Sequence, residues 1–270
     1  MRCHRNIMSI WLNKMHLHMN DGLAEGYKSN SQKARVITEN WVDNNMFCPI
    51  CGNINISRLE NNKPVADFYC QKCNQQYELK SKNTKNISKI VDGAYATMID
   101  RITSHNNPHL FCMSYSTHDW CVRDFLLIPK YFFTPVVIEK RPPLADTARR
   151  RGWVGCNILL TSIPAIGKIS IIENGNIKNK KDIMHKVALS EKLQTKDIND
   201  RCWLLDVFAC IEKIKSVTFC LKEVYAFENT LSMTHPNNHH IKDKIRQQLQ
   251  VLRNKGFIEF LGDGKYRKVT

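Results

Sequence analysis

Three charged residues in one stretch have the types and spacing of a metal-dependent hydrolytic site. Asp67 and Glu78 are separated by ten residues, and Lys80 follows after one more, which gives the pattern D-x10-E-x-K. Two carboxylates converging from neighbouring strands can hold Mg²⁺ against a phosphate oxygen, and a lysine beside them can orient or help deprotonate the attacking water. We predict these three residues as catalytic. Surface ion pairing is the ordinary alternative for such a pattern.

Four cysteines around the same stretch have the spacing of zinc ligands. Cys48 and Cys51 form one C-x2-C knuckle, Cys70 and Cys73 form another, and 18 residues separate the two. Each knuckle can present two thiolates to one metal, so the four together predict a tetrahedral Zn²⁺ site. Four thiolates leave no open position for water. We therefore expect this zinc to be structural.

The elements that carry these residues explain why the two sites overlap. Alternate side chains of a strand face the same way, so Glu78 and Lys80 in YELKS share one face. The second knuckle lies in the turn between the Asp67 segment and the Glu78 strand. A metal bound at that turn fixes the hairpin and the separation of the two carboxylates. We predict that the zinc supports the structure and that the carboxylates carry the chemistry.

The rest of the first two thirds of the chain mixes helical and strand patterns. A helix is predicted over 31–42, where Ala34, Ile37 and Trp41 share a face, and another over 91–102, stopped by the NNP sequence. Buried strands are predicted over 110–116 and 125–133, from their length and their β-branched and aromatic content. Asn174-Gly175 is a strong turn signal for a hairpin over 168–178. This is a mixed α/β pattern.

The C-terminal part has a different organisation. A polar linker is predicted over 181–200, followed by three helices and a hairpin, the order of a winged helix, over 201–270. From residue 237 to the end there are 8 Lys and Arg against 3 acids. A basic third helix and a basic wing favour insertion into a DNA groove over a merely solvated face. The candidate contacts are Asn238, Lys242 and Arg246 in the groove, and Lys265 and Arg267 on the wing.

The whole-chain totals agree with a nucleic-acid partner. A formal net charge of +15 and a pI near 9.4 over 270 residues favour polyanions. Eleven cysteines, an odd number, without an export signal indicate a reducing, cytoplasmic location, and no apolar run reaches the roughly 18 residues of a membrane span. We expect residues 1–25 to be an N-terminal extension, either a flexible arm or an upstream start preceding the true one.

Several stretches resemble a known family. YKSNSQKAR, PVADFYC, ELKSK, DGAYATM, TARRRGWVGCNI, and HIKDKIRQQLQVLR followed by KYRK are similar to the DpnI family of methyl-directed type II restriction endonucleases, from about residue 26 to the end. The resemblance implies a PD-(D/E)xK nuclease domain with an embedded zinc site over 26–180, and a winged helix that binds the same DNA sequence. It implies cleavage of double-stranded GATC carrying N6-methyladenine. Ala66 replaces the usual proline of the motif, as in DpnI-like sequences.

The resemblance also implies roles for individual residues. Asp67 and Glu78 would bind Mg²⁺, the Leu79 carbonyl would add a ligand, and Lys80 would assist the water.

The loop RRRGWVGCN is our candidate for reading the methyl group. An apolar ring beside three arginines suits a loop that faces DNA, so we expect Trp153 to pack on the methyls. Arg149, Arg150 and Arg151 would hold phosphates or guanine edges. The other interpretation of Trp153 is a core residue near the end of a loop. Two DNA-binding domains in one chain predict a monomer.

Two other functions fit the same residues. One is a non-catalytic DNA-binding regulator, a zinc ribbon plus a winged helix, in which the D-x10-E-x-K residues are surface ion pairs. The other is a nuclease that has lost activity or changed its target sequence. His109, His118 and the His239-His240 pair have no partner at metal or catalytic spacing, and we expect them in loops or facing DNA.

Overall fold

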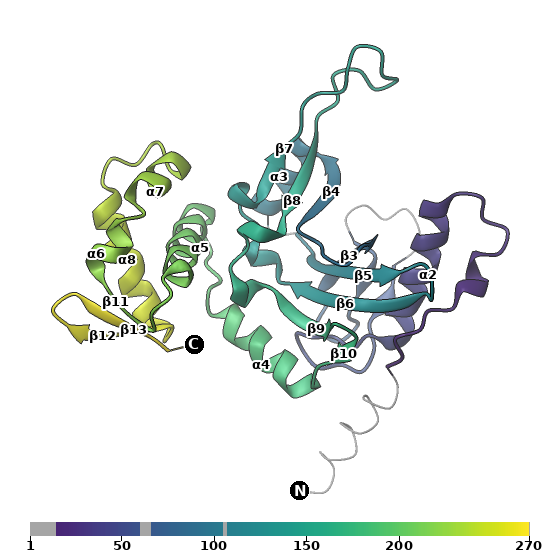
Figure 1. The fold of residues 1–270 in the computed structure, drawn as a ribbon, viewed down its shortest axis with the longest axis horizontal. Helices are drawn as coiled ribbons and strands as arrows, with labels where there is room; N and C mark the ends of the chain where they lie inside the picture. The colour runs from purple at the N-terminus through teal and green to yellow at the C-terminus, as the bar shows by residue number, and fades with distance from the viewer. Residues whose placement is uncertain (1–14, 60–65, 105–106, 270) are drawn as a thin grey trace, which may run out of the picture. The chain divides into compact units, whose positions relative to one another are not determined.

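The computed structural model describes residues 15–59, 66–104 and 107–269 (Figure 1). Contacts within the chain divide it into two compact units. Unit 1 comprises residues 1–90, 104–130 and 166–190, and unit 2 comprises residues 91–103, 131–165 and 191–270. Within the described ranges no helix is both long and apolar enough to cross a membrane.

Unit 1 is built on a seven-stranded sheet with the order β1-β2-β3-β5-β6-β9-β10. Strands β3 and β5 are parallel, and the other neighbours are antiparallel. The central strand β5 is buried along its whole length, as its apolar sequence predicts. The bounds are β1 (Ser57–Arg58), β2 (Phe68–Tyr69), β3 (Gln76–Asn83), β5 (His109–Ser116), β6 (Cys121–Ile128), β9 (Ile169–Glu173) and β10 (Asn176–Ile177).

Two strand predictions are met with small differences. The expected strand over 125–133 ends at Ile128, and a 3-10 turn, η2 (Lys130–Phe132), follows it. Pro129 explains the change, because proline has no N–H to continue the ladder. The hairpin of β9 and β10 turns at Asn174 and Gly175, whose φ angles of 49° and 74° are those of the expected tight turn.

Helix α2 (Asn30–Asn45) packs on the sheet of unit 1 through the predicted face. Ile37 and Trp41 are buried, and the Trp41 ring meets Phe125 edge-on at 5.4 Å. Thr38 on the same helix lies 3.2 Å from Ser81 of β3 (Oγ1 to Oγ), which places the helix over that strand. A short 3-10 helix, η1 (Asp21–Ala24), precedes it.

Part of the expected N-terminal extension is packed rather than loose. Met15 and Met19 are buried in the core of unit 1, and the Met19 N–H donates to the Trp120 carbonyl at 2.8 Å. His18 forms a bridge with Cys121 of β6. The alternation of apolar residues in MHLHM, which favours an extended segment on a sheet, accounts for this. Residues 1–14 lie outside the described ranges.

The expected linker over 181–200 also differs from the structure. Helix α4 (Lys180–Glu191) occupies its first half, and Ile183 and Val187 belong to the core of unit 1. These two residues are four apart and therefore share a helix face, a weak apolar stripe within a polar run. Only residues 192–197 separate α4 from the next helix.

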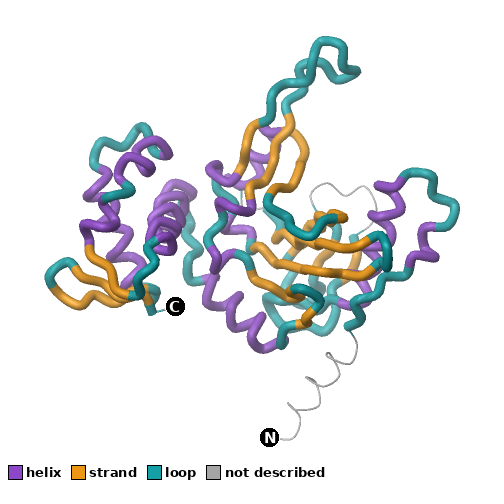
Figure 2. The backbone as a smooth tube through the Cα atoms, viewed as in Figure 1, coloured by secondary structure: helices purple, strands orange, loops and turns teal. Residues whose placement is uncertain are grey.

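A smaller three-stranded sheet, in which β7 and β8 are antiparallel, carries the arginine-rich loop. Its order is β4-β8-β7, and residues 141–154 join β7 to β8 as a long loop that projects beyond both strands (Figures 1 and 2). The helix expected from Val91 begins four residues later, because 91–94 continue β4. The bounds are β4 (Lys89–Ala94), α3 (Tyr95–Thr103), η3 (Pro135–Val137), β7 (Ile138–Lys140), β8 (Gly155–Leu159), η4 (Leu160–Ser162) and η5 (Ala165–Gly167).

The C-terminal segment is a winged helix. Helix α8 carries Ile241, Ile245, Leu249 and Leu252 on its buried face, as its spacing predicts, and Gly256 (φ 80°) ends it. A three-stranded sheet of order β11-β13-β12 forms the wing. The expected second helix is two short helices. The bounds are α5 (Ile198–Lys213), β11 (Thr218–Cys220), α6 (Leu221–Tyr225), α7 (Glu228–Thr234), α8 (Ile241–Asn254), β12 (Ile258–Gly262) and β13 (Lys265–Lys268).

Candidate active site, zinc centre and DNA-binding surfaces

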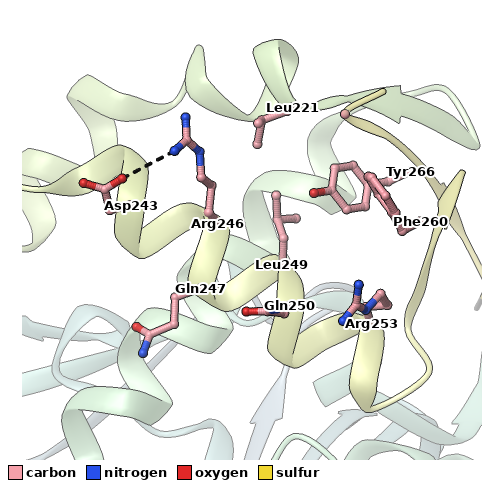
Figure 3. A pocket seen from close by; sticks show the side chains of 10 residues that line it. Leu221, Asp243, Arg246, Gln247, Leu249, Gln250, Arg253, Phe260 and Tyr266 are labelled. Atoms are coloured by element: carbon pink, nitrogen blue, oxygen red, sulfur yellow. Dashed lines mark ion pairs between the residues drawn. The ribbon is translucent and has the colours of Figure 1, made fainter. Parts of the chain in front are cut away.

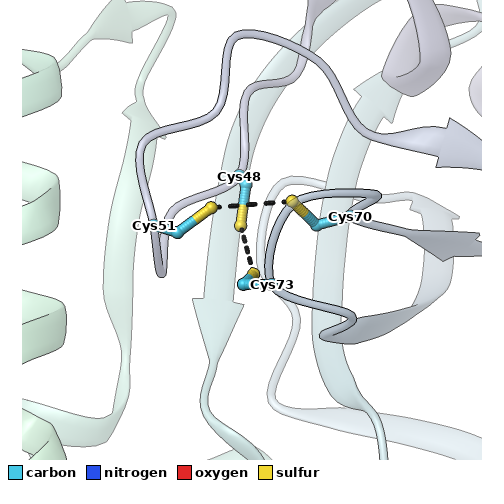
Figure 4. Close-up of side chains that lie close together, drawn as sticks. All are labelled: Cys48, Cys51, Cys70 and Cys73. Atoms are coloured by element: carbon cyan, nitrogen blue, oxygen red, sulfur yellow. Dashed lines mark hydrogen bonds between the residues drawn. The ribbon is translucent and has the colours of Figure 1, made fainter.

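The four predicted cysteines meet in one cluster. Their sulfur atoms all lie within 4.8 Å of one another, with Cys48 Sγ 3.5 Å from Cys73 Sγ and Cys51 Sγ 3.6 Å from Cys70 Sγ (Figure 4). A tetrahedral zinc with Zn–S bonds of about 2.3 Å places its sulfurs about 3.8 Å apart. The cluster therefore has the dimensions and the donor set of a four-cysteine zinc site.

Two further residues surround the cysteine cluster. The Tyr77 hydroxyl lies 3.0 Å from Cys48 Sγ, where it can donate to a thiolate. Lys180 of α4 donates to the Gly52 carbonyl at 2.8 Å and lies over the Phe47 ring at 4.7 Å, although only 9% of it is exposed. Zn²⁺ with four thiolates carries two negative charges, so a buried ammonium beside it is a counter-charge. Burial lowers the pKa of Lys180, and the neighbouring cysteines oppose that shift.

The second knuckle forms the turn between β2 and β3, as predicted. The Cys70 N–H donates to the Gln75 carbonyl at 2.9 Å, and Asn74 takes a positive φ of 57° to close the turn. Beyond the turn Phe68 pairs with Tyr77, and the Asp67 N–H donates to the Tyr77 carbonyl at 2.9 Å. The metal cluster and the two carboxylate positions are thus joined by a few residues of hairpin.

His109 is a structural residue of this turn, so the expectation that it lies in a loop or faces DNA is wrong. It is 3% exposed, and its Nδ1 accepts the Lys130 N–H at 3.3 Å, which leaves Nε2–H to donate to Gln75 Oε1 at 3.0 Å. Its ring stacks on Tyr77. Burial, and then the charge of Lys130, lowers the pKa of His109 to about 3. The imidazole is therefore neutral at physiological pH.

The structure brings the three predicted catalytic residues to neighbouring positions: Glu78 and Lys80 lie on β3, and Asp67 immediately precedes β2 and contacts the backbone of β3. Asp67 Oδ2 accepts the backbone N–H of Leu79 at 2.7 Å, and Lys80 Nζ lies 2.8 Å from Glu78 Oε1. Tyr77 is fully buried and Leu79 packs against the core, while the side chains of Glu78 and Lys80 are partly exposed. The alternation predicted for YELKS is therefore present.

The Asp67 carboxylate is in an environment that disfavours its charge. Burial raises the pKa of Asp67, and the carboxylate of Glu39 adds to that, while the Leu79 N–H, Lys80 and Arg35 oppose it. A bound divalent cation would remove this penalty, so the site is suited to hold one.

Sequence reasoning missed the neighbouring charges of α2 and β1. Glu39 is buried on the helix, and its two carboxylate oxygens contact Arg35 (Nε to Oε1, 2.6 Å) and Arg58 (Nη2 to Oε2). The available sequence signal was a glutamate four residues after an arginine on the predicted helix.

The arginine-rich loop brings some of its predicted residues together. The Arg150 guanidinium lies 4.5 Å from the centre of the Trp153 ring. Trp153 is half-buried, and its ring lies so close to Gly155 that a Cβ there would be 2.7 Å away. Arg151 forms an exposed ion pair with Asp146 at 3.0 Å, and Arg149 is exposed. Trp153 is thus a partly exposed residue of a basic loop and not a core residue.

In the winged helix several predicted DNA contacts already have partners. Lys242 Nζ lies 3.2 Å from Glu228, and Arg267 Nε lies 3.0 Å from Glu259. The Asn238 side chain accepts the His240 N–H at 2.7 Å and shapes the turn before α8. Lys265 is exposed on the wing.

A pocket of about 530 Å³ lies between α8 and the wing (Figure 3). Arg246 lines it and also contacts the Tyr225 hydroxyl. Sequence reasoning did not identify the other polar residues of its helix wall, Gln247, Gln250 and Arg253, or the wing residues Phe260 and Tyr266. For the three helix residues, the available sequence signal was the exposed polar face of α8 opposite its apolar face.

These features define a mixed α/β domain with an embedded four-cysteine cluster, followed by a helix-turn-helix domain of the winged type. Comparison with protein families gives the same division: the DpnI model (Dam-replacing family) matches residues 15–196, and the DpnI_C model (Dam-replacing HTH domain) matches residues 199–268. The chain belongs to the DpnI family. Membership supports a methylation-dependent restriction enzyme, a nuclease that binds DNA.

Proposed function

We propose that the chain is a Mg²⁺-dependent type II endonuclease that hydrolyses phosphodiester bonds of double-stranded DNA at GATC containing N6-methyladenine. The observation that carries this proposal is the placement of Asp67 and Glu78 on the two arms of one hairpin, with Lys80 forming an ion pair with Glu78. The family match supports the nuclease, and the methyl and sequence preferences rest on the resemblance of the motifs.

The residues have separate tasks in this reaction. Asp67, Glu78 and the Leu79 carbonyl would hold Mg²⁺, which when bound supplies charge at the scissile phosphate and acidifies the attacking water. Lys80 presents an ammonium to that water and to the phosphate. The Leu79 N–H keeps the Asp67 carboxylate in position. The cysteine cluster, with Zn²⁺, fixes the separation of the two carboxylate-bearing arms.

Two DNA-reading surfaces give a physical reason for selectivity. A methyl group in an apolar pocket is worth roughly 1–3 kcal/mol, so one domain discriminates weakly. A second domain reading the same site multiplies the ratio. We propose that Trp153 packs on the methyls, flanked by Arg149, Arg150 and Arg151.

In the winged helix we propose that the groove is read by Asn238, Lys242 and Arg246, and the wing phosphates by Lys265 and Arg267. With both surfaces in one chain, we propose that a monomer acts in two functional parts, 26–180 and 201–270.

A plasmid prepared from adenine-methylating and non-methylating hosts tests the proposal. With Mg²⁺ present, we expect discrete GATC fragments from the methylated plasmid and none from the other. Trp153→Ala should lose cutting while the protein melts normally, with Trp153→Phe as the aromatic control. Cutting of both plasmids would retain the nuclease and reject methyl sensing.

The alternative is the non-catalytic regulator, and one observation favours it: Glu78 and Lys80 do form the ion pair that it requires. The variant Glu78→Ala separates the two functions. If the chain is a nuclease, the wild type cuts DNA, and Glu78→Ala binds DNA like the wild type but leaves it uncut. If the chain is a regulator, the wild type itself makes no strand breaks with any divalent metal.

A further inference from the structure

A second charged group lies beside the candidate active site and has no part in the chemistry described above. It consists of Arg35 and Glu39 of α2 and Arg58 of β1, here called the arginine bracket. We propose that Arg35 and Arg58 bind a phosphate of the DNA backbone next to the bond that is cut, and that Glu39 holds both guanidinium groups in place. This deepens the proposed function and rests on it.

Glu39 is suited to hold the arginines rather than to bind a metal. Its side chain is 6% exposed, and each carboxylate oxygen already contacts one guanidinium, Oε1 that of Arg35 and Oε2 that of Arg58. Burial of a carboxylate is costly unless it is paired and hydrogen-bonded. Both requirements are met by the two arginines, so Glu39 is a positioning residue.

The arginines themselves are not buried. The side chain of Arg35 is 59% exposed and that of Arg58 is 35% exposed. A guanidinium has five N–H donors in a planar fork, so one edge can hold a carboxylate while another binds a phosphate oxygen. Two guanidinium charges against one carboxylate leave the bracket with a net positive charge.

The bracket is fixed next to Asp67. Strand β1 pairs with β2 so that Arg58 opposes Phe68, and the next N–H, that of Leu59, donates to the Asp67 carbonyl at 2.8 Å. Glu39 contacts both Arg35 and Arg58, so Arg35 belongs to the same cluster of charges. A phosphate on the bracket would thus be a neighbour of the one at the catalytic carboxylates.

The surrounding helix also favours an anion. Between Glu25 and Glu39 the sequence has no acidic residue and three basic ones, Lys28, Lys33 and Arg35. An ordinary surface ion-pair network places acids among its bases, and this segment does not. The charge of the segment over 26–38 is therefore only positive, which is complementary to a DNA backbone.

The test is the salt dependence of DNA binding by the full chain, without added Mg²⁺ so that no cutting occurs. The variant Arg35→Met/Glu39→Met/Arg58→Met removes the whole bracket and leaves no unpaired buried carboxylate. Lys178→Met is the matched control, because it also lowers the net charge by one and lies at the opposite edge of the sheet, next to β10. Each protein is titrated with methylated and unmethylated GATC duplexes between low and high salt.

The slope of log K against log salt is negative, and each lost phosphate contact should reduce its magnitude by about 0.9 and weaken binding about eightfold at 0.1 M salt. Because the bracket holds one phosphate, we expect the triple variant to lose about 0.9 from the magnitude of the slope on both duplexes, and Lys178→Met to keep the wild-type slope. Thermal unfolding reports whether the triple variant folds. If the triple variant fails to fold, the same titration with Arg35→Met decides, and we expect its slope to lose the magnitude of one phosphate contact.

A folded bracket variant with the wild-type slope would overturn the inference while leaving the nuclease proposal intact. The converse is also distinguishable. If the wild type shows no preference for methylated GATC and the slope still falls in the variant, the proposed specificity fails and the phosphate site stands, because backbone contacts are independent of sequence.

Discussion

Acidification should destabilise the hairpin that carries the candidate active site, and His109 makes this measurable. His109 is buried against Tyr77, with its two ring nitrogens bonded to Gln75 and to the Lys130 N–H. Its pKa is about 3 in the folded chain against an ordinary value of 6.5. Because the folded pKa is lowered, the unfolded state takes up the proton first. Stability from this residue is therefore present above pH 6.5 and lost as the pH falls below it.

The size of the effect follows from these two values. At pH 5.5 protonation of the unfolded state costs the fold RT ln(1 + 10), about 1.4 kcal/mol, and at pH 7.5 it costs less than about 0.1 kcal/mol. The difference, about 1.3 kcal/mol, is insensitive to the folded pKa as long as that pKa lies well below 5.5.

The perturbation is His109→Gln, which keeps a donor and an acceptor but does not titrate. Urea unfolding followed by tryptophan fluorescence, with zinc present, gives the free energy of unfolding at both pH values. We expect the wild type to lose about 1.3 kcal/mol more than the variant between pH 7.5 and 5.5. The variant will be less stable at pH 7.5, because it lacks the ring that stacks on Tyr77.

The control is His118→Gln, which changes an exposed histidine of the same unit. It should follow the wild type at both pH values. Equal pH dependence in the wild type and His109→Gln would refute the assignment of a neutral, buried imidazole to this turn.

Three further outcomes are expected. Cys73→Ala should lose its zinc and its cleavage even with excess Mg²⁺, whereas Cys121→Ala, outside the cluster, should keep both; a fully active Cys73→Ala enzyme contradicts the supporting role of the zinc. Lys180→Met should release zinc to a chelator about tenfold faster than the wild type, and Lys180→Arg should not, because loss of an outer partner weakens a metal site; equal release rates would show that its charge is irrelevant. Asp67→Asn should raise the melting temperature of the Mg²⁺-free protein at pH 8, since burial raises the pKa of that carboxyl and its ionisation opposes folding above the ordinary pKa. The gain should vanish as the pH falls well below the ordinary aspartate pKa of about 3.9, because the carboxyl is then protonated in both the folded and the unfolded state. Equal melting temperatures at pH 8 would argue against a penalised carboxylate.

The sequence by itself determined the local chemistry. Cysteine spacing is a property of short segments, so Cys48, Cys51, Cys70 and Cys73 could be grouped before any fold was known. The period of two in YELKS and the apolar spacing of α8 likewise express local backbone geometry. These patterns placed the hairpin, the cluster and the wing.

Only the tertiary structure decided which distant residues join these sites. Glu39 comes from a helix, Arg58 from a strand and Asp67 from the segment before β2, and their proximity depends on how α2 packs over the sheet. The burial and the partners of His109 and Lys180 could not be predicted for the same reason, since a lone histidine or lysine has no spacing that predicts burial. Burial and charge pairing arise from packing between segments far apart in sequence, and periodicity contains no information about that packing.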